Sequence, residues 1–97
     1  MSSSIPDQIK GFFDDHDRLI QWPSKQAAKE LAIAFLASKF EQDHIYTEYQ
    51  INEILKQWHT FSDWPLLRRE LFNRGYLGRE LSGAKYWLID RLDKPVL

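Results

Sequence analysis

The sequence predicts a mainly helical α+β domain, a winged helix-turn-helix-like core of three helices followed by a small β-hairpin as the wing. Two observations predict this fold class. Apolar residues recur at helical spacing in three segments between residues 24 and 75, each bounded by residues typical of helix ends. Residues 76–89 instead form two short β-prone runs around Ser82-Gly83, a turn dipeptide. The predicted order is therefore helix, short strand, helix, helix and hairpin.

Length and composition limit the chain to one small domain. It has 97 residues, 43% of them hydrophobic, and no cysteine, which excludes disulfides and thiolate metal sites within it. We expect an N-terminal arm at 1–17, the domain at 18–91 and a C-terminal tail at 92–97. The first residues do not resemble a signal peptide, and the longest apolar run, Leu31 to Ala37, is far shorter than the ~20 residues of a membrane span. We therefore expect a cytoplasmic protein with no membrane partner.

The arm and the first helix come first in the chain. After Pro6, one short amphipathic turn or two is expected in the arm, from the spacing of Ile5, Ile9, Phe12 and Phe13. Residues 18–22 are expected to be extended and to stop at Pro23. The first helix is then predicted from a cap at Ser24 to about Lys39. Its expected core face consists of Ala28, Leu31, Ala32 and Phe35, and Leu36 and Phe40 broaden this face.

The second helix has the clearest start signal. Thr47-Glu48-Tyr49-Gln50 is a capping box, in which the Thr47 hydroxyl accepts the backbone N–H of Gln50 while the Gln50 side chain reaches back. Ile45-Tyr46, directly before it, is long enough for one brief strand. The expected core face follows the helical repeat through Ile51, Ile54, Leu55 and Trp58.

The third helix and the hairpin complete the predicted fold. Asp63 is the expected N-cap, Pro65 is tolerated in the first turn, and Gly75 ends the helix in the left-handed conformation. The inward face consists of Trp64, Leu67 and Leu71. The hairpin strands are predicted at 76–81 and 84–89. Tyr86 and Trp87 are adjacent on the second strand, so one should face the core and the other the surface.

Five short blocks follow one another along the chain. They are Tyr46-Thr47-Glu48, Ile51 to Lys56, Leu67 to Leu71, Gly75-Tyr76-Leu77 and Tyr86-Trp87-Leu88. In this order they resemble the bacterial family known as domain of unknown function 2087, over roughly residues 22–89. Members of that family occur as lone short proteins or joined behind a helix-turn-helix domain of transcriptional regulators. The resemblance implies a winged-helix-like fold and a link to gene regulation, and it implies no catalytic residues and no cofactor.

Positive charge gathers in the C-terminal part of the chain. Residues 1–63 hold 6 basic and 10 acidic residues, a balance of −4, whereas residues 64–91 hold 6 basic and 3 acidic residues, a balance of +3. With its apolar stripe inward, the third helix is expected to carry Arg69, Glu70 and Asn73 on its outer face. Arginine and asparagine read base edges and grip phosphates. We therefore expect double-stranded DNA as the leading partner, bound by Arg68, Arg69, Asn73, Arg74, Arg79 and Lys85.

Three alternatives stay open. Arg68 and Arg74 can instead pair with acids such as Glu70, Glu48 or Asp63, and Glu70 on the outer face would repel phosphate. The domain can also be a protein-interaction or homodimerisation module without nucleic-acid binding, which uses an exposed hairpin aromatic and the apolar N-terminal arm. A small-molecule sensor is supported by the aromatic content alone.

Signals of catalysis and metal binding are weak. Asp14-Asp15-His16-Asp17 places carboxylates beside a histidine, but consecutive residues do not converge on one point. His44 and His59 stand far off, at no ligand spacing. The four glycines are scattered, which excludes a phosphate-binding glycine loop. We therefore expect no enzymatic activity, no metal and no cofactor.

Overall fold

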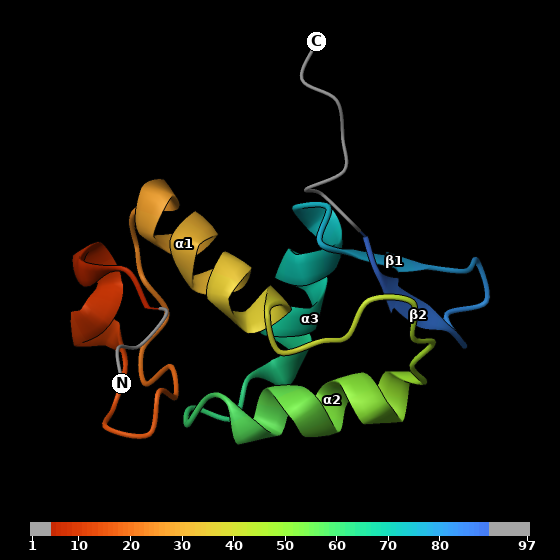
Figure 1. The fold of residues 1–97 in the computed structure, drawn as a ribbon, viewed down its shortest axis with the longest axis horizontal. Coiled ribbons are helices and arrows are strands. Elements are labelled where there is room, and N and C mark those ends of the chain that lie inside the picture. Colours follow the sequence, from red (N-terminus) through yellow and green to blue (C-terminus); the bar gives the residue numbers. More distant parts are fainter. Residues whose placement is uncertain (1–4, 90–97) are drawn as a thin grey trace, which may run out of the picture.

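The structure, a computed structural model, describes residues 5–89 (Figure 1). It contains a short 3-10 helix, three α-helices and an antiparallel hairpin, which confirms the predicted mainly helical α+β fold class. The bounds are η1 Asp7–Phe12, α1 Gln26–Ala37, α2 Glu48–Gln57, α3 Trp64–Asn73, β1 Leu77–Arg79 and β2 Tyr86–Leu88. The predicted tail at 92–97 and the last two residues of the predicted domain lie outside the described residues.

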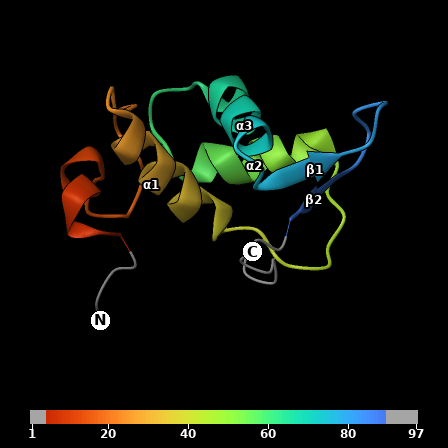
Figure 2. The same ribbon diagram turned by 90° about the horizontal axis from the view of Figure 1, so that it is seen from above.

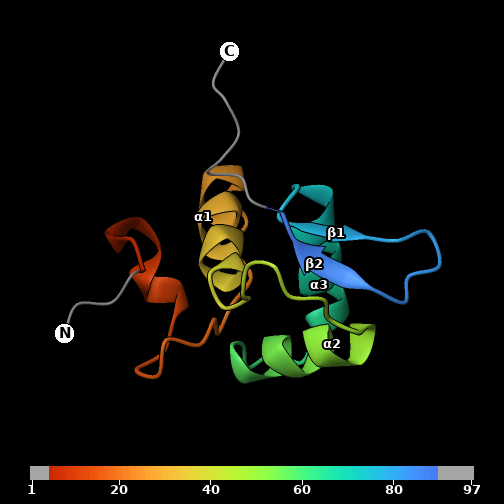
Figure 3. The same ribbon diagram turned by 45° about the vertical axis from the view of Figure 1, so that its right-hand side comes forward.

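Helix α1 lies in the middle of the molecule, between η1 and α3 (Figure 1, Figure 3). It buries Ala32, Ile33, Phe35, Leu36 and Ala37. Because the helix has neighbours on two sides, Ile33 and Ala37 join the predicted face, whereas Ala28 and Leu31 are only partly buried. The predicted cap at Ser24 is wrong, since Lys25 is the N-cap and its side chain makes no capping bond. The helix also ends at Ala37, earlier than predicted, where the Ser38 hydroxyl donates to the Phe35 carbonyl.

The start of α2 confirms the predicted capping box. The backbone N–H of Gln50 donates to Thr47 Oγ1 at 3.1 Å, and the backbone N–H of Thr47 donates to Gln50 Oε1 at 2.9 Å. Two donors at the helix start are thereby satisfied within the local sequence. Ile51 and Leu55 are fully buried as predicted, whereas Ile54 and Trp58, also predicted in the core, are partly buried and pack against it.

Helix α3 also begins and ends where the sequence predicts. Asp63 Oδ1 accepts the backbone N–H of Leu66 at 3.3 Å, and Pro65 lies in the first turn. Gly75 has φ +85°, a conformation that a residue with a Cβ rarely adopts. Leu67 and Leu71 are fully buried and set the face of α3 that points into the core.

The hairpin is tied to the segment before α2. Leu77 pairs with Leu88 and Arg79 with Tyr86 in an antiparallel ladder. The predicted brief strand at Ile45-Tyr46 is present as a single bridge, in which Tyr46 and Tyr86 exchange two backbone hydrogen bonds of 2.8 Å. This bridge therefore joins a residue before α2 to a residue after α3 by β-type pairing.

The hairpin loop is wider than predicted. The strands at 76–81 and 84–89 were expected to meet at a two-residue turn, but the ladder spans only 77–79 and 86–88. The backbone N–H of Gly83 donates to the Glu80 carbonyl at 2.9 Å, and Gly83 has φ +77°. Beyond the strands, the backbone N–H of Glu80 still donates to the Lys85 carbonyl at 3.1 Å, so the loop covers 81–84, and Leu81 within it is fully exposed.

The two aromatic residues of β2 point to opposite faces, as predicted. Tyr86 is buried in the core, whereas Trp87 is half-buried on the other face and lies over Gly78. A Cβ at residue 78 would lie 2.5 Å from Trp87 Nε1, so the indole fits only because this position is glycine.

The described part of the N-terminal arm packs on α1. Ile5, Ile9 and Phe13 are buried, and the Phe13 ring meets the Phe35 ring edge-on at 5.1 Å. All three ribbon views place η1 on the side of α1 away from the hairpin (Figure 1, Figure 2, Figure 3). The apolar arm and the hairpin therefore belong to opposite ends of the molecule.

The predicted extended segment at 18–22 joins the arm to the end of α2. Leu19 is buried, its backbone N–H donates to the Trp58 carbonyl at 2.9 Å, and its carbonyl accepts from Thr60 at 3.0 Å. Next to this contact lies the buried ring of His59. Its Nε2 accepts the Asp63 N–H at 2.9 Å, so Nδ1 carries the proton and donates to the Leu55 carbonyl at 2.6 Å.

Candidate nucleic-acid interface

A hollow of about 290 Å³ lies between α3 and the hairpin. Four residues of the predicted DNA-binding set line it, Arg68, Arg69, Asn73 and Arg79. Pro65, Phe72 and Tyr86 complete its lining, so that no acidic residue of the described chain is among the lining side chains. The hollow therefore combines three guanidinium groups with one exposed aromatic ring.

The helical repeat explains how α3 divides its polar residues. Because Leu67 and Leu71 point inward, the residues on either side of this stripe point to different neighbours. Glu70 and Arg74 lie on the flank toward α1, where their partners are found. Arg69 and Asn73 are exposed on the side opposite the stripe. Phe72 lies on the flank toward the hairpin, where its ring contacts Arg79.

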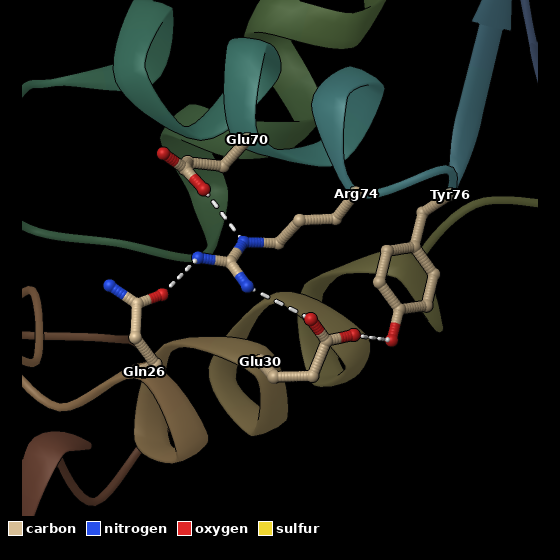
Figure 4. A network of polar contacts seen from close by, with 5 residues as sticks. All are labelled: Gln26, Glu30, Glu70, Arg74 and Tyr76. Carbon is tan, nitrogen blue, oxygen red and sulfur yellow. Dashed lines mark hydrogen bonds and ion pairs between the residues drawn. The ribbon is translucent and has the colours of Figure 1, made fainter.

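Arg74 is engaged inside the fold (Figure 4). Its Nε donates to Glu70 Oε1 at 2.7 Å, and two other guanidinium nitrogens donate to Glu30 Oε1 at 2.9 Å and Gln26 Oε1 at 3.2 Å. The hydroxyl of Tyr76 donates to the second oxygen of Glu30 at 2.6 Å. These carboxylates, Glu70 first and then Glu30, raise the pKa of Arg74 above its ordinary value. Arg74 thus links α3 to α1 and does not reach the hollow.

The same network corrects the expected position of Glu70. The helical repeat predicts this carboxylate on the outer face of α3, where it would repel a phosphate. In the structure it is three-quarters buried and turned toward Arg74, because the flank of α3 that carries it faces α1. The predicted pairing of Arg74 with Glu70 is confirmed.

Arg68 lies at the base of the hollow, on the side of α2. One guanidinium nitrogen donates to Asn52 Oδ1, and another lies 3.9 Å from Glu48 Oε2. The predicted alternative of an ion pair with Glu48 is therefore confirmed for Arg68. Glu48 also accepts a hydrogen bond of 3.1 Å from the hydroxyl of Tyr86, another residue that lines the hollow. Arg68 is held in one orientation while it still lines the hollow.

Arg79 is held by an aromatic ring. Its guanidinium carbon lies 4.5 Å from the centroid of Phe72, a cation–π geometry. Phe72 remains 37% exposed beneath it. Within residues 5–89, the side chains of Arg69, Asn73 and Lys85 have no hydrogen-bond or ion-pair partner, and all three are exposed. Lys85 lies on the hairpin outside the hollow.

Sequence reasoning missed Phe72 as a member of this site. The available signal was an aromatic residue placed off the apolar stripe of α3, because a large apolar side chain on a polar flank needs a partner or a ligand. Pro65 and Tyr86 were recognised for their roles in the fold, but not as walls of a hollow.

The rest of the described chain offers no comparable cluster of functional groups. Asp14 accepts backbone N–H groups of His16 and Arg18 at 2.9 Å and pairs with the Arg18 side chain. The backbone N–H of Arg18 is the main cause that lowers the pKa of Asp14. Asp14 thus shapes a turn, and in residues 5–89 no group of acidic residues and histidines is placed to hold a metal ion.

Across residues 5–89, every helix is too short or too polar to cross a lipid bilayer.

Comparison with known proteins places the chain in a family. A family model described as an uncharacterized protein conserved in bacteria, DUF2087, matches residues 18–88 of the 97. The match begins after η1 and includes every residue that lines the hollow. No curated protein and no solved structure matches the chain. Since the family model covers well over half of the sequence, the chain belongs to the bacterial DUF2087 family.

Proposed function

We propose that this protein is a winged-helix module that binds double-stranded DNA and acts in transcriptional regulation. The observation that carries the proposal is the hollow between α3 and the hairpin, which three arginines line without a carboxylate. In this proposal α3 enters the major groove, and the hairpin rests on the backbone beside it.

The connection between the elements supports the winged-helix assignment. Helices α2 and α3 pack together, and the hairpin follows α3 directly. The bridge between Tyr46 and Tyr86 joins the segment before α2 to the second hairpin strand. The bridge holds the hairpin against the segment before α2, and β1 contacts α3. In this proposal the helix in the groove and the wing on the backbone therefore bind the same duplex together.

The predicted DNA-binding side chains differ in how well they are placed to contact DNA. Arg69 and Asn73 are free to contact bases or phosphates, and Arg79 and Lys85 reach from the hairpin. Arg74 is left out of the proposed interface because its guanidinium is occupied by Glu70 and other partners on α1. With so few free cations, tight binding requires a dimer or a second binding unit. The role is one of binding and not of catalysis, in the cytoplasm.

A salt-dependent titration tests the proposal. Fluorescence anisotropy is measured with a labelled random-sequence duplex at about 50 and about 150 mM salt. If Arg69, Arg79 and Lys85 each neutralise one phosphate, the affinity should fall about 20-fold between these salt concentrations. The Arg69→Met variant should weaken binding and reduce the slope of log affinity against log salt concentration by about one, as expected for the loss of one phosphate contact. Lys25→Met removes one exposed charge outside the hollow and should bind like the wild type. No binding of the duplex at low salt would rule out the proposal.

A protein-interaction module is the second candidate, supported by exposed apolar side chains. Leu81 is fully exposed on the hairpin loop, and Ile45 and Tyr49 are 56% and 70% exposed near the start of α2. The apolar residues of the described arm are instead buried in the core, which leaves the hairpin as the contact surface of this candidate. Light scattering tests it, because a stable dimer that Leu81→Ser dissociates would favour protein contact through the loop.

A further inference from the structure

The hollow between α3 and the hairpin has features of a site for one phosphate group. Its three arginines come from two elements, α3 and β1, and face a common space of about 290 Å³. Among the described residues, Glu48 is the acidic residue that contacts lining side chains, since its carboxylate lies 3.1 Å from the Tyr86 hydroxyl and 3.9 Å from Arg68. Three guanidinium groups against one carboxylate leave an excess of positive charge, which attracts an anion of high charge.

Two of the three arginines are held in place before any ligand arrives. Arg68 donates to Asn52, and Arg79 rests on the ring of Phe72. Holding a flexible side chain in advance lowers the entropy that binding would otherwise cost. Arg69, which has no side-chain partner in residues 5–89, remains available to close over a bound group.

We propose that this hollow binds a single phosphate group, with Arg69 and Arg79 as the contacting residues and Arg68 as the cation at its base. Guanidinium groups bind phosphate oxygens with two parallel hydrogen bonds, so a pair of arginines suits a phosphate better than a smaller monovalent anion. Asn73 of α3 also lines the hollow, and its side-chain amide can donate a hydrogen bond to the phosphate.

The arrangement of α3 and the hairpin indicates one source of that phosphate. If α3 lies in a groove of DNA and the hairpin rests outside it, the strand that borders the groove must pass between them. The hollow lies in that passage. This assignment of the phosphate to a DNA strand rests on the proposed function, whereas affinity for phosphate itself can be measured without DNA. A free phosphorylated small molecule would present the same chemistry.

The test is a titration of the full chain with inorganic phosphate, followed by NMR. Ionic strength is kept constant with chloride, and the Nε–H signals of arginine and the amides of α3 and β1 are observed. Phosphate up to about 20 mM detects dissociation constants in the millimolar range. Saturable shifts should be confined to the hollow. Arg79→Met should weaken binding about tenfold, since one charge-assisted contact is lost.

Two further variants separate the proposed site from a general charge effect. Phe72→Leu keeps all charges but removes the ring beneath Arg79, and should weaken phosphate binding about two- to fivefold. Lys25→Met removes one positive charge at the start of α1, away from the hollow, and should leave phosphate binding unchanged.

Adding a short duplex distinguishes the possible sources of the phosphate. If inorganic phosphate binds and the duplex competes with it, the hollow holds a phosphate of a DNA strand. If phosphate binds but the duplex does not, the site holds, its ligand is a free phosphorylated molecule, and the proposed DNA function fails. If phosphate causes no saturable shift in the hollow, or binds Arg79→Met as tightly as the wild type, the site is overturned whether or not the duplex binds.

Discussion

Replacing Arg74 with methionine tests whether its network holds α3 against α1. The substitution keeps most of the aliphatic stem and removes the three hydrogen bonds of 2.7 to 3.2 Å to Glu70, Glu30 and Gln26. The Arg74 side chain is 20% exposed, whereas the side chains of Glu70 and Glu30 are 23% and 42% exposed. Both carboxylates would lose their cation in a partly desolvated position.

The expected loss follows from this partial burial. Hydrogen bonds to charged groups contribute about 1.5–3 kcal/mol each when buried, and exposed ion pairs less than about 1 kcal/mol. Solvent screening lowers these contributions, so we expect the loss of the whole network to reduce the free energy of unfolding by about 2–3 kcal/mol. A domain of this length has a total stability of about 5–15 kcal/mol, so the variant should still fold. Its Tm should fall by about 8–24 °C.

Urea unfolding at neutral pH measures this loss, with Arg69→Met as the matched control. Arg69 lies on the exposed side of the same helix and has no side-chain partner within residues 5–89, so its replacement should change stability by less than about 0.5 kcal/mol. Tyr76→Phe completes a double-mutant cycle, because Tyr76 and Arg74 share Glu30. A coupling energy of about 0.5–1 kcal/mol is expected. If Arg74→Met and Arg69→Met are equally stable, the network does not hold the two helices together.

Three other substitutions test the remaining structural arguments. His59→Ala should cost about 2–4 kcal/mol in urea unfolding, because it removes a buried ring and leaves the backbone N–H of Asp63 without its acceptor; a loss below about 1 kcal/mol would contradict the assigned hydrogen bonds. Gly78→Ala should destabilise by about 1–3 kcal/mol and shift the indole N–H signal of Trp87, and an unmoved signal would argue against their close contact. Asp14→Asn should lower Tm at neutral pH, and thermal scans should show the difference shrinking as pH falls below about 4. The contacts with Arg18 lower the pKa of Asp14, so its stabilisation is present above the pKa of the unfolded chain and is lost as pH falls through the lower folded value. A difference that stays constant down to pH 2 would contradict this role.

The starts of α2 and α3 and the end of α3 followed from the sequence because they depend on nearby residues. The bonds between Thr47 and Gln50, and from the Leu66 N–H to Asp63, span three positions. The φ of +85° at Gly75 is likewise a local requirement. Such signals can be recognised in the sequence without knowledge of the fold. The short helix of the arm and the order of the elements followed for the same reason.

The local rules were insufficient where several bends were possible. Ser24 has the chemistry of a cap, yet Lys25 occupies that position without a side-chain bond. Ser82-Gly83 suggested a two-residue turn, but the bond from Gly83 to Glu80 gives a wider loop. In both places more than one local arrangement satisfies the backbone, and packing selects among them.

The sequence by itself determined the element order, the apolar faces and four of the residues that line the hollow. Only the tertiary structure decided which cations remain available. Arg74 and Tyr76 meet Glu30 across 44 and 46 positions of the chain, a separation at which no periodicity signals contact. This contact turns Glu70 and Arg74 toward α1, while the hairpin brings Arg79 over Phe72. The net charge of the hollow therefore depends on ion pairs between residues far apart in the sequence. These pairs neutralise some charged side chains and leave others facing solvent.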